Sequence, residues 1–137
     1  MSIPDFGTPH YGLTRNLTDT TIDEAKDRAT AALSTEGFGI LTEIDVQATF
    51  SAKLGKSIAG YTILGACSPS LAHQALQFES AIGLLMPCNV VISEQSTGDI
   101  CVSIADPVHM FQPLNRPDMH DFARQIQAQL QRALDQM

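Results

Sequence analysis

The pattern of apolar and polar residues along the chain predicts five β-strands. Each candidate strand is a short run rich in β-branched, aromatic or other apolar residues, and turn residues bound it. The five runs are residues 11–17, 38–46, 61–66, 89–95 and 100–105. A compact turn, Ser-Thr-Gly-Asp, joins the last two runs, so we expect these two strands to pair as an antiparallel hairpin.

Two of these runs differ in how their apolar residues are spaced. Residues 61–66 contain no charge, which suits a strand that is buried on both faces. In residues 38–46, Ile40, Thr42 and Ile44 alternate with Leu41, Glu43 and Asp45. Alternation of this kind predicts a strand with one face on the core and the other in water.

Residues 22–35 are predicted to form the first helix, because their apolar positions recur every three or four residues. Thr21 and Glu24 have the spacing of a capping box, in which Thr21 is the N-cap. Gly37 is placed to end the helix in the left-handed conformation. We interpret these features as structural.

Two further helices are predicted downstream. Residues 46–54 suit a brief helix with Phe50 and Leu54 facing inward. Residues 118–135 suit a longer helix that packs on the sheet through one apolar stripe. The stripe consists of Met119, Phe122, Ala123, Ile126, Leu130, Ala133 and Leu134.

The most specific local signal is the passage from the central strand into a helix at Cys67. Ser68 can serve as N-cap, and Pro69 suits the first helical position, where its missing N–H costs nothing. A thiol at a helix N-terminus faces unpaired N–H groups and the positive end of the helix dipole, which favours the thiolate form. The alternative is that Cys67 is a small buried hydrophobic residue in a tight turn.

A second cysteine, Cys88, follows Pro87 where the next strand begins. Proline has no N–H to donate to a sheet and belongs at a strand start or edge. If the two strands are antiparallel neighbours, the end of one and the start of the other meet, and Cys67 lies near Cys88. The third cysteine, Cys101, lies on the face opposite its apolar neighbours, and we interpret it as structural.

The segments GFGILTEIDV, KLGKSIAGYTILGACSPSLAHQAL and IGLLMPCNVVI, together with Asp106-Pro107, resemble the domain-of-unknown-function family numbered 302. The resemblance spans about residues 22–108. It implies an α+β fold, a single two-layer domain in which helices pack on one face of a curved, mainly antiparallel sheet, and pairing as a homodimer. It implies no established activity. The residues that carry it are Cys67, Pro69, Ala72, Ala75, Leu76, Pro87, Cys88 and Asn89.

Length and charge limit the classes of function. The 137 residues suit one domain, 1–137, with an irregular segment at 1–10 and a linker at 112–117. A formal charge of −7 and the lack of a basic cluster argue against binding to nucleic acid or to an acidic membrane surface. No run is apolar enough to cross a bilayer and no signal peptide is evident, so we expect a cytoplasmic protein without a disulfide framework.

No known metal motif is present among the cysteines and the four histidines. His73 lies six positions after Cys67, well away from the same helix face. A soft metal ion, copper(I) or zinc, could still be held by Cys67, Cys88 and a histidine that the fold brings near. No nucleotide-binding loop is found, and no catalytic residue can be assigned.

Three hypotheses follow. The first is a module that binds a small molecule or metal ion at the strand-to-helix turn, for which the candidate residues are Cys67, Ser68, Pro69, Cys88 and Asn89. An open cleft between the central helix and the sheet would be its site. The second is a thiol redox protein that cycles a Cys67–Cys88 disulfide. The third is a structural dimerisation domain in which the cysteines only pack.

Overall fold

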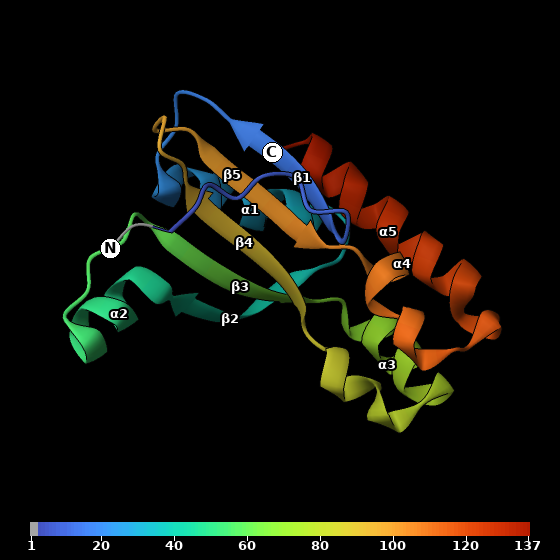
Figure 1. Ribbon diagram of the computed structural model, residues 1–137. Helices are drawn as coiled ribbons and strands as arrows, with labels where there is room; N and C mark the ends of the chain where they lie inside the picture. Colours follow the sequence, from blue (N-terminus) through green and yellow to red (C-terminus); the bar gives the residue numbers. More distant parts are fainter. Residues whose placement is uncertain (1–2) are drawn as a thin grey trace.

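A five-stranded sheet is the centre of the structure, a computed structural model that describes residues 3–137 (Figure 1). Its strands follow the order β1-β5-β4-β3-β2, and every neighbouring pair is antiparallel. The predicted strands and the hairpin of the last two are confirmed. The bounds are β1 (Gly12–Leu17), β2 (Gly39–Asp45), β3 (Tyr61–Cys67), β4 (Cys88–Glu94) and β5 (Ile100–Ala105).

Two long helices, α1 (Ile22–Thr35) and α5 (His120–Asp135), cover one face of this sheet (Figure 1). The shorter helices lie at its two ends: α2 (Val46–Leu54) at one end, α3 (Pro69–Phe78) and α4 (Pro107–Met110) at the other. Three 3₁₀ turns, η1 (Ser80–Leu85), η2 (Gln112–Leu114) and η3 (Pro117–Met119), connect them. The predicted α+β class is confirmed. No helix among residues 3–137 is long and apolar enough to span a membrane.

The core lies between the sheet and the two long helices. All seven residues of the apolar stripe predicted for the C-terminal helix are buried. They face the buried side chains of the central strands, among them Leu64, Val90, Ile92, Val102 and Ile104. Burial of these faces against one another is the main favourable term in folding, because it removes apolar surface from water.

Local signals place α1 as predicted. The Thr21 Oγ1 atom accepts a hydrogen bond from the Glu24 N–H at 3.2 Å, and Gly37 ends the helix with φ +85°. The Glu24 carboxylate accepts from the hydroxyl of Thr20 rather than from the backbone of the cap residue. One of the two hydrogen bonds of the predicted capping box therefore forms, the one that Thr21 accepts. The second, from the Thr21 backbone N–H to Glu24, is replaced by the bond from the Thr20 hydroxyl.

The opposite face of the sheet is crossed by the N-terminal segment, residues 3–11, which has no regular secondary structure (Figure 1). Tyr11, which was predicted to begin the first strand, precedes β1. The Asp5 carboxylate accepts hydrogen bonds from the backbone N–H and the hydroxyl of Ser96, and the Phe6 N–H donates to the Gln95 side chain. Cys101 of β5 is buried. The assignment of Cys101 to the face away from the helices is consistent with the pairing of the strands.

Two expectations about strand faces are wrong. A bulge between Ile40 and Thr42 shifts the β2 register, so these residues leave the sheet on opposite faces and strict alternation fails. The shift turns Glu43 toward α1, where Lys26 pairs with it at 2.8 Å. The central strand is not buried on both faces either, because Ile63 is only half-buried on the face away from the helices.

The orientation predicted for the second helix is also wrong. Leu54 is 62% exposed, and no residue of α2 is buried. The helix lies at the end of the sheet instead of over its apolar face (Figure 1), so it has no core to pack against. Its apolar residues are part of a surface region that also includes Leu41 and Ile44 of β2.

We predict that Gly65→Ala destabilises the fold by about 1–3 kcal/mol, because a new methyl group would be forced into a packed site. A Cβ at Gly65 would lie 2.8 Å from Pro87 Cγ and also against Thr42 Oγ1. Urea denaturation measures the difference. Gly39→Ala, on the neighbouring strand, is the matched control, since a Cβ there meets nothing within 4 Å. Equal stability of the two variants would contradict the packing argument.

Candidate functional site

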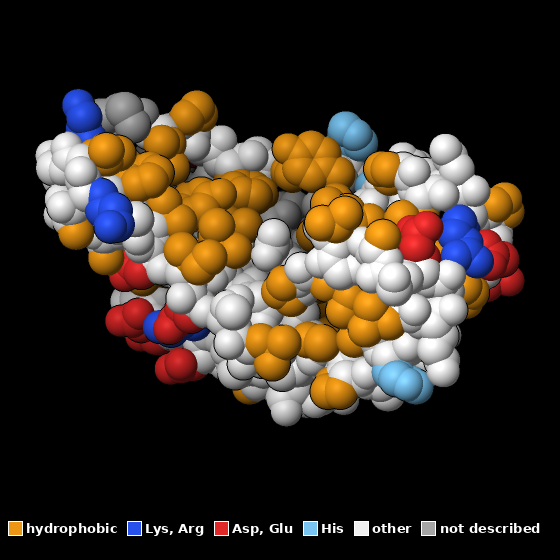
Figure 2. All heavy atoms as spheres, turned by 90° about the horizontal axis from the view of Figure 1, so that it is seen from below, with side chains coloured by type: hydrophobic (Ala, Val, Ile, Leu, Met, Phe, Trp, Pro, Cys, Tyr) orange, Lys and Arg blue, Asp and Glu red, His pale blue; other side chains and the backbone are white. Residues whose placement is uncertain are grey.

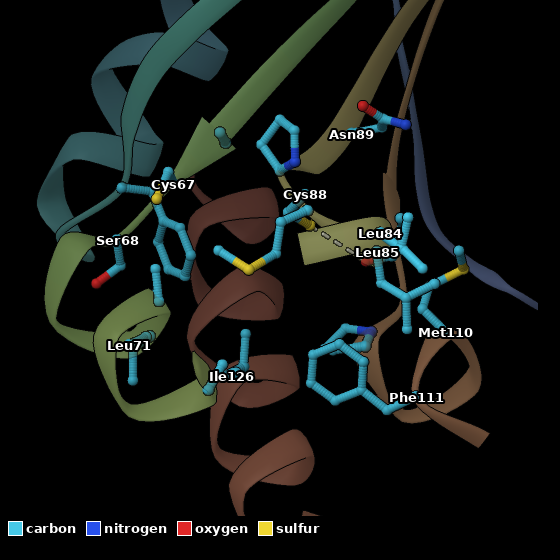
Figure 3. Close-up of a pocket in the computed structure, with 18 residues that line it drawn as sticks. Cys67, Ser68, Leu71, Leu84, Leu85, Cys88, Asn89, Met110, Phe111 and Ile126 are labelled. Carbon is cyan, nitrogen blue, oxygen red and sulfur yellow. Dashed lines mark hydrogen bonds between the residues drawn. The ribbon is translucent and has the colours of Figure 1, made fainter. Parts of the chain in front are cut away.

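A cavity of about 230 Å³ opens at the end of the sheet where β3 ends and β4 begins. In Figure 3, Leu71 of α3 lies on one side of it, Met110 and Phe111 on the other, and Ile126 of α5 below. The lining also includes Leu84 and Leu85 of η1. We call this space the apolar cavity, since none of the charged side chains among residues 3–137 lines it.

The antiparallel register places both sequence-predicted cysteines at this cavity. Ala66 lies directly opposite Cys88, so Cys67, one residue further along β3, reaches the same end of the sheet. Four of the five predicted ligand-binding residues line the cavity: Cys67, Ser68, Cys88 and Asn89. The fifth, Pro69, is exposed and does not line it.

The turn at Cys67 is built as the sequence indicates, with one difference. Ser68 occupies the N-cap position of α3 and Pro69 the first turn, but the Ser68 hydroxyl makes no capping hydrogen bond. In Figure 3 this hydroxyl points away from the other labelled side chains. The start of α3 therefore depends on Pro69, whose fixed φ favours the first helical position.

The Cys88 thiol is held in a protonated form. It donates a hydrogen bond to the Ala105 carbonyl oxygen at an Sγ–O distance of 3.5 Å. Burial, and secondarily the negative charge of Asp106, raises the pKa of this thiol to about 12. A thiol in this state is a poor nucleophile and a poor metal ligand, because both roles need the thiolate.

The two cysteines do not face each other. Residues directly opposite each other share a face of a sheet, and neighbours along a strand alternate. Cys88 shares the face of Ala66, so Cys67 projects from the other face of the strand pair. In Figure 3 the Cys88 sulfur is directed toward Ala105, on the side away from Cys67, and all three cysteines are free thiols.

The wall on the α4 side is fixed by a buried carboxylate, Asp106, which is 4% exposed. It accepts hydrogen bonds from the Val108 N–H at 3.0 Å and from the Gln127 side-chain amide at 3.0 Å, and it pairs with His109 at 3.1 Å. These contacts cap α4 and attach it to α5. The sequence Asp106-Pro107 is explained by this helix start, because Asp106 caps α4 and Pro107 occupies its first turn.

Most of the lining was not predicted as part of a site. Phe38, Leu71, Leu85, Met110, Phe111 and Ile126 come from five separate stretches of the chain. Each resembles an ordinary core residue in the sequence, and only the fold brings them around one space. One feature of the sequence could have indicated the site, the apolar run Leu84-Leu85-Met86-Pro87 before Cys88. These residues fit neither a helix nor a strand period, so their burial needs a contact outside regular secondary structure.

The residues at the cavity do not form a metal centre. Among residues 3–137, no group of three or more histidine, cysteine, aspartate or glutamate side chains is arranged to hold a metal ion. The hypothesis of a soft metal on Cys67, Cys88 and a histidine therefore has no support from the arrangement of these side chains. The structure brings Asp106, His109 and His10 together instead, with ring centroids of the two histidines 5.5 Å apart.

Comparison with known proteins identifies the family. The family described as "Domain of unknown function DUF302" matches this chain over residues 13–137. The chain belongs to the DUF302 family. The match includes the C-terminal helix, which the resemblance in the sequence did not cover. No curated protein matches the chain.

A solved DUF302 structure has the same fold. It is described as an uncharacterized conserved protein DUF302 from Bacillus stearothermophilus and is 25% identical to this chain. The alignment covers 93% of this chain and 98% of the other, with a TM-score of 0.86. The predicted family and fold are thus confirmed, and neither comparison assigns an activity to this DUF302 protein.

We predict that only Cys67 reacts rapidly with a neutral thiol reagent in the native DUF302 protein at pH 8. With a pKa of about 12, Cys88 is thiolate in roughly one molecule in ten thousand at that pH, and burial also raises the pKa of Cys101. Cys67 is half-buried and lines the cavity. Mass spectrometry counts the labels.

The controls for this experiment are the two serine variants. Cys67→Ser should abolish the rapid label, and Cys88→Ser should retain it. The Cys88 label should appear only as the pH rises toward 12, where its thiolate forms. Simultaneous labelling of Cys67 and Cys88 at pH 8 would contradict the protonated state assigned to Cys88.

Proposed function

We propose that this DUF302 protein binds a small, mainly apolar molecule in the apolar cavity. The observation that carries the proposal is the composition of the lining: aliphatic, aromatic and thioether side chains surround the space, with polar groups contributed by a few residues. Binding sites for small molecules have this character. A volume of about 230 Å³ lies below the usual range for drug-sized ligands, about 300–1,000 Å³, and favours a small ligand.

The rim of the cavity supports the proposal. Leu84 of η1 is 89% exposed although it lines the cavity, so its side chain stands at the opening. At this position Leu84 extends the apolar surface of the cavity to its mouth, and apolar surface that is continuous with a cavity is typical of a ligand-binding groove. A bound molecule would bury Leu84 and leave Asn89, which is exposed, to contact a polar group.

The geometry favours binding over thiol redox chemistry. A disulfide needs two sulfurs that face each other, and Cys67 and Cys88 project from opposite faces of the strand pair. The protonated state of Cys88 also makes it a poor nucleophile toward an oxidised Cys67. Cys67 then contributes to the cavity as a polarizable side chain and a weak hydrogen-bond donor.

We predict that Ala72→Phe weakens binding of a neutral apolar dye, Nile red, at least about tenfold. Ala72 lines the cavity on α3, and a benzyl group there would occupy the space. Fluorescence titration measures the affinity. Ala48→Phe on α2 is the matched control, because Ala48 is exposed and lies outside the cavity. The proposal fails if the native protein shows no saturable binding, or if both variants bind alike while circular dichroism shows them folded.

We also propose that two copies of the chain associate through β2. The strand is at the edge of the sheet, so one side of its backbone has no strand partner. Leu41 and Ile44 of β2 and Leu54 of α2 are all at least half exposed. Figure 2 shows hydrophobic side chains gathered over this region. A second β2 can approach about a two-fold axis and continue the antiparallel sheet.

We predict that Ile44→Glu converts the dimer to a monomer, because two carboxylates would be buried near the two-fold axis. Light scattering after size-exclusion chromatography gives the mass. Leu84→Glu is the matched control, since it changes an exposed apolar residue at the other end of the molecule. A native protein that elutes as a monomer at all concentrations would contradict the pairing.

A further inference from the structure

A second cavity, of about 200 Å³, lies next to the first. It is formed by the segment that follows α4 and by the first turns of α5. The side chains that line it include Phe111, Gln112, Arg116, His120 and Arg124. We call it the basic cavity. Of the residues that the structure describes, Phe111 is the one that lines both cavities, so it forms the boundary between them.

The charge of the basic cavity contrasts with that of the chain. The protein has eight basic and fifteen acidic residues, yet the described residues that line this space include two arginines and no aspartate or glutamate. The described residues that line the apolar cavity carry no charge of either sign. A molecule in the apolar cavity that carries an anionic group could therefore place that group near Arg116 and Arg124 by extending past Phe111 into the basic cavity.

The two arginines play different parts. Arg116 is held in place: its Nε and Nη2 atoms donate to the Asp118 carboxylate, and its Nη1 atom donates to the Phe78 carbonyl oxygen. This pairing fixes the wall of the basic cavity and leaves Arg116 little capacity for a further partner.

Arg124 has free donors within the described part of the chain, residues 3–137, where its one ion pair is to Asp121 at 3.3 Å. This pair joins a side chain that is 63% exposed to one that is 99% exposed. Such a pair contributes little, so an incoming anion can replace it. A guanidinium group has five N–H donors in a planar arrangement that suits the oxygens of a carboxylate.

We propose that the ligand is an amphipathic organic anion, with its hydrocarbon part in the apolar cavity and a carboxylate at Arg124 in the basic cavity. This inference rests on the proposed function and adds the class of ligand. Phe111 lies between the two parts and packs against the hydrocarbon. His120 and Gln112 line the same space and supply further hydrogen-bonding groups.

The test compares decanoate with decan-1-ol, which have the same chain length and differ in charge, as competitors of Nile red in the native protein. The carboxylate should bind more tightly. Arg124→Gln should weaken decanoate binding about three- to fivefold and leave decan-1-ol unchanged, as expected for a partly exposed ion pair. Arg28→Gln on α1, an exposed arginine outside both cavities, is the control for the change in net charge.

The outcomes separate the two proposals. Equal affinities of decanoate and decan-1-ol, unchanged by Arg124→Gln, overturn the anionic class and leave the apolar binding function intact. An equal loss for both ligands in Arg124→Gln also overturns it, because the effect would then come from a change in structure. If neither compound displaces the dye and the dye itself does not bind, the proposed function fails as well.

Discussion

The antiparallel pairing of β3 with β4 is the constraint on which the site depends. It brings Cys67, at the end of one strand, and Cys88, at the start of the next, to a single edge of the sheet. The pairing in turn needs Gly65, because Pro87 and the β2 side chain of Thr42 fill the space where a Cβ would stand. A small residue in the middle of a strand thus allows the loop before β4 to lie close to the sheet, and the cavity wall begins there.

The cavity exists because the short helices extend beyond the sheet. α1 and α5 lie flat on the strands, and most of their apolar residues are buried there. α3 and α4 follow strand ends instead, so their apolar sides meet across a space that the sheet does not fill (Figure 1). Asp106 holds one of these helices at a fixed distance by binding α5 through Gln127. The same arrangement of elements therefore produces the close-packed core under α1 and α5 and the apolar cavity between α3 and α4.

The sequence was informative wherever a signal was local. The cap at Thr21, the stop at Gly37, the Cys67 turn and the C-terminal stripe depend on neighbouring residues. The structure agrees with these predictions, except that the Ser68 hydroxyl makes no capping hydrogen bond. The bulge in β2 and the exposure of Leu54 depend on what lies opposite in space, and both were mispredicted. The meeting of Cys67 and Cys88 at one edge of the sheet was predicted only for antiparallel strands, because the sequence did not determine the strand direction. The lining from Phe38 to Ile126 could not be foreseen, since its members meet only in the folded chain.

The N-terminal segment gives the sheet two unequal halves. Where it crosses the strands, β5 is covered on both faces, by α5 and α1 on one side and by this segment on the other. β2 has no such cover on both faces, and its pairing with β3 is interrupted by the bulge between Ile40 and Thr42. Local opening then costs least at the β2 edge and most at β5, since the free energy of opening rises with the contacts that must be broken. The two walls of the apolar cavity therefore differ in stability. The β3 wall is next to β2, where local opening costs least, and the wall formed by α4 and α5 is attached to β5, where opening costs most.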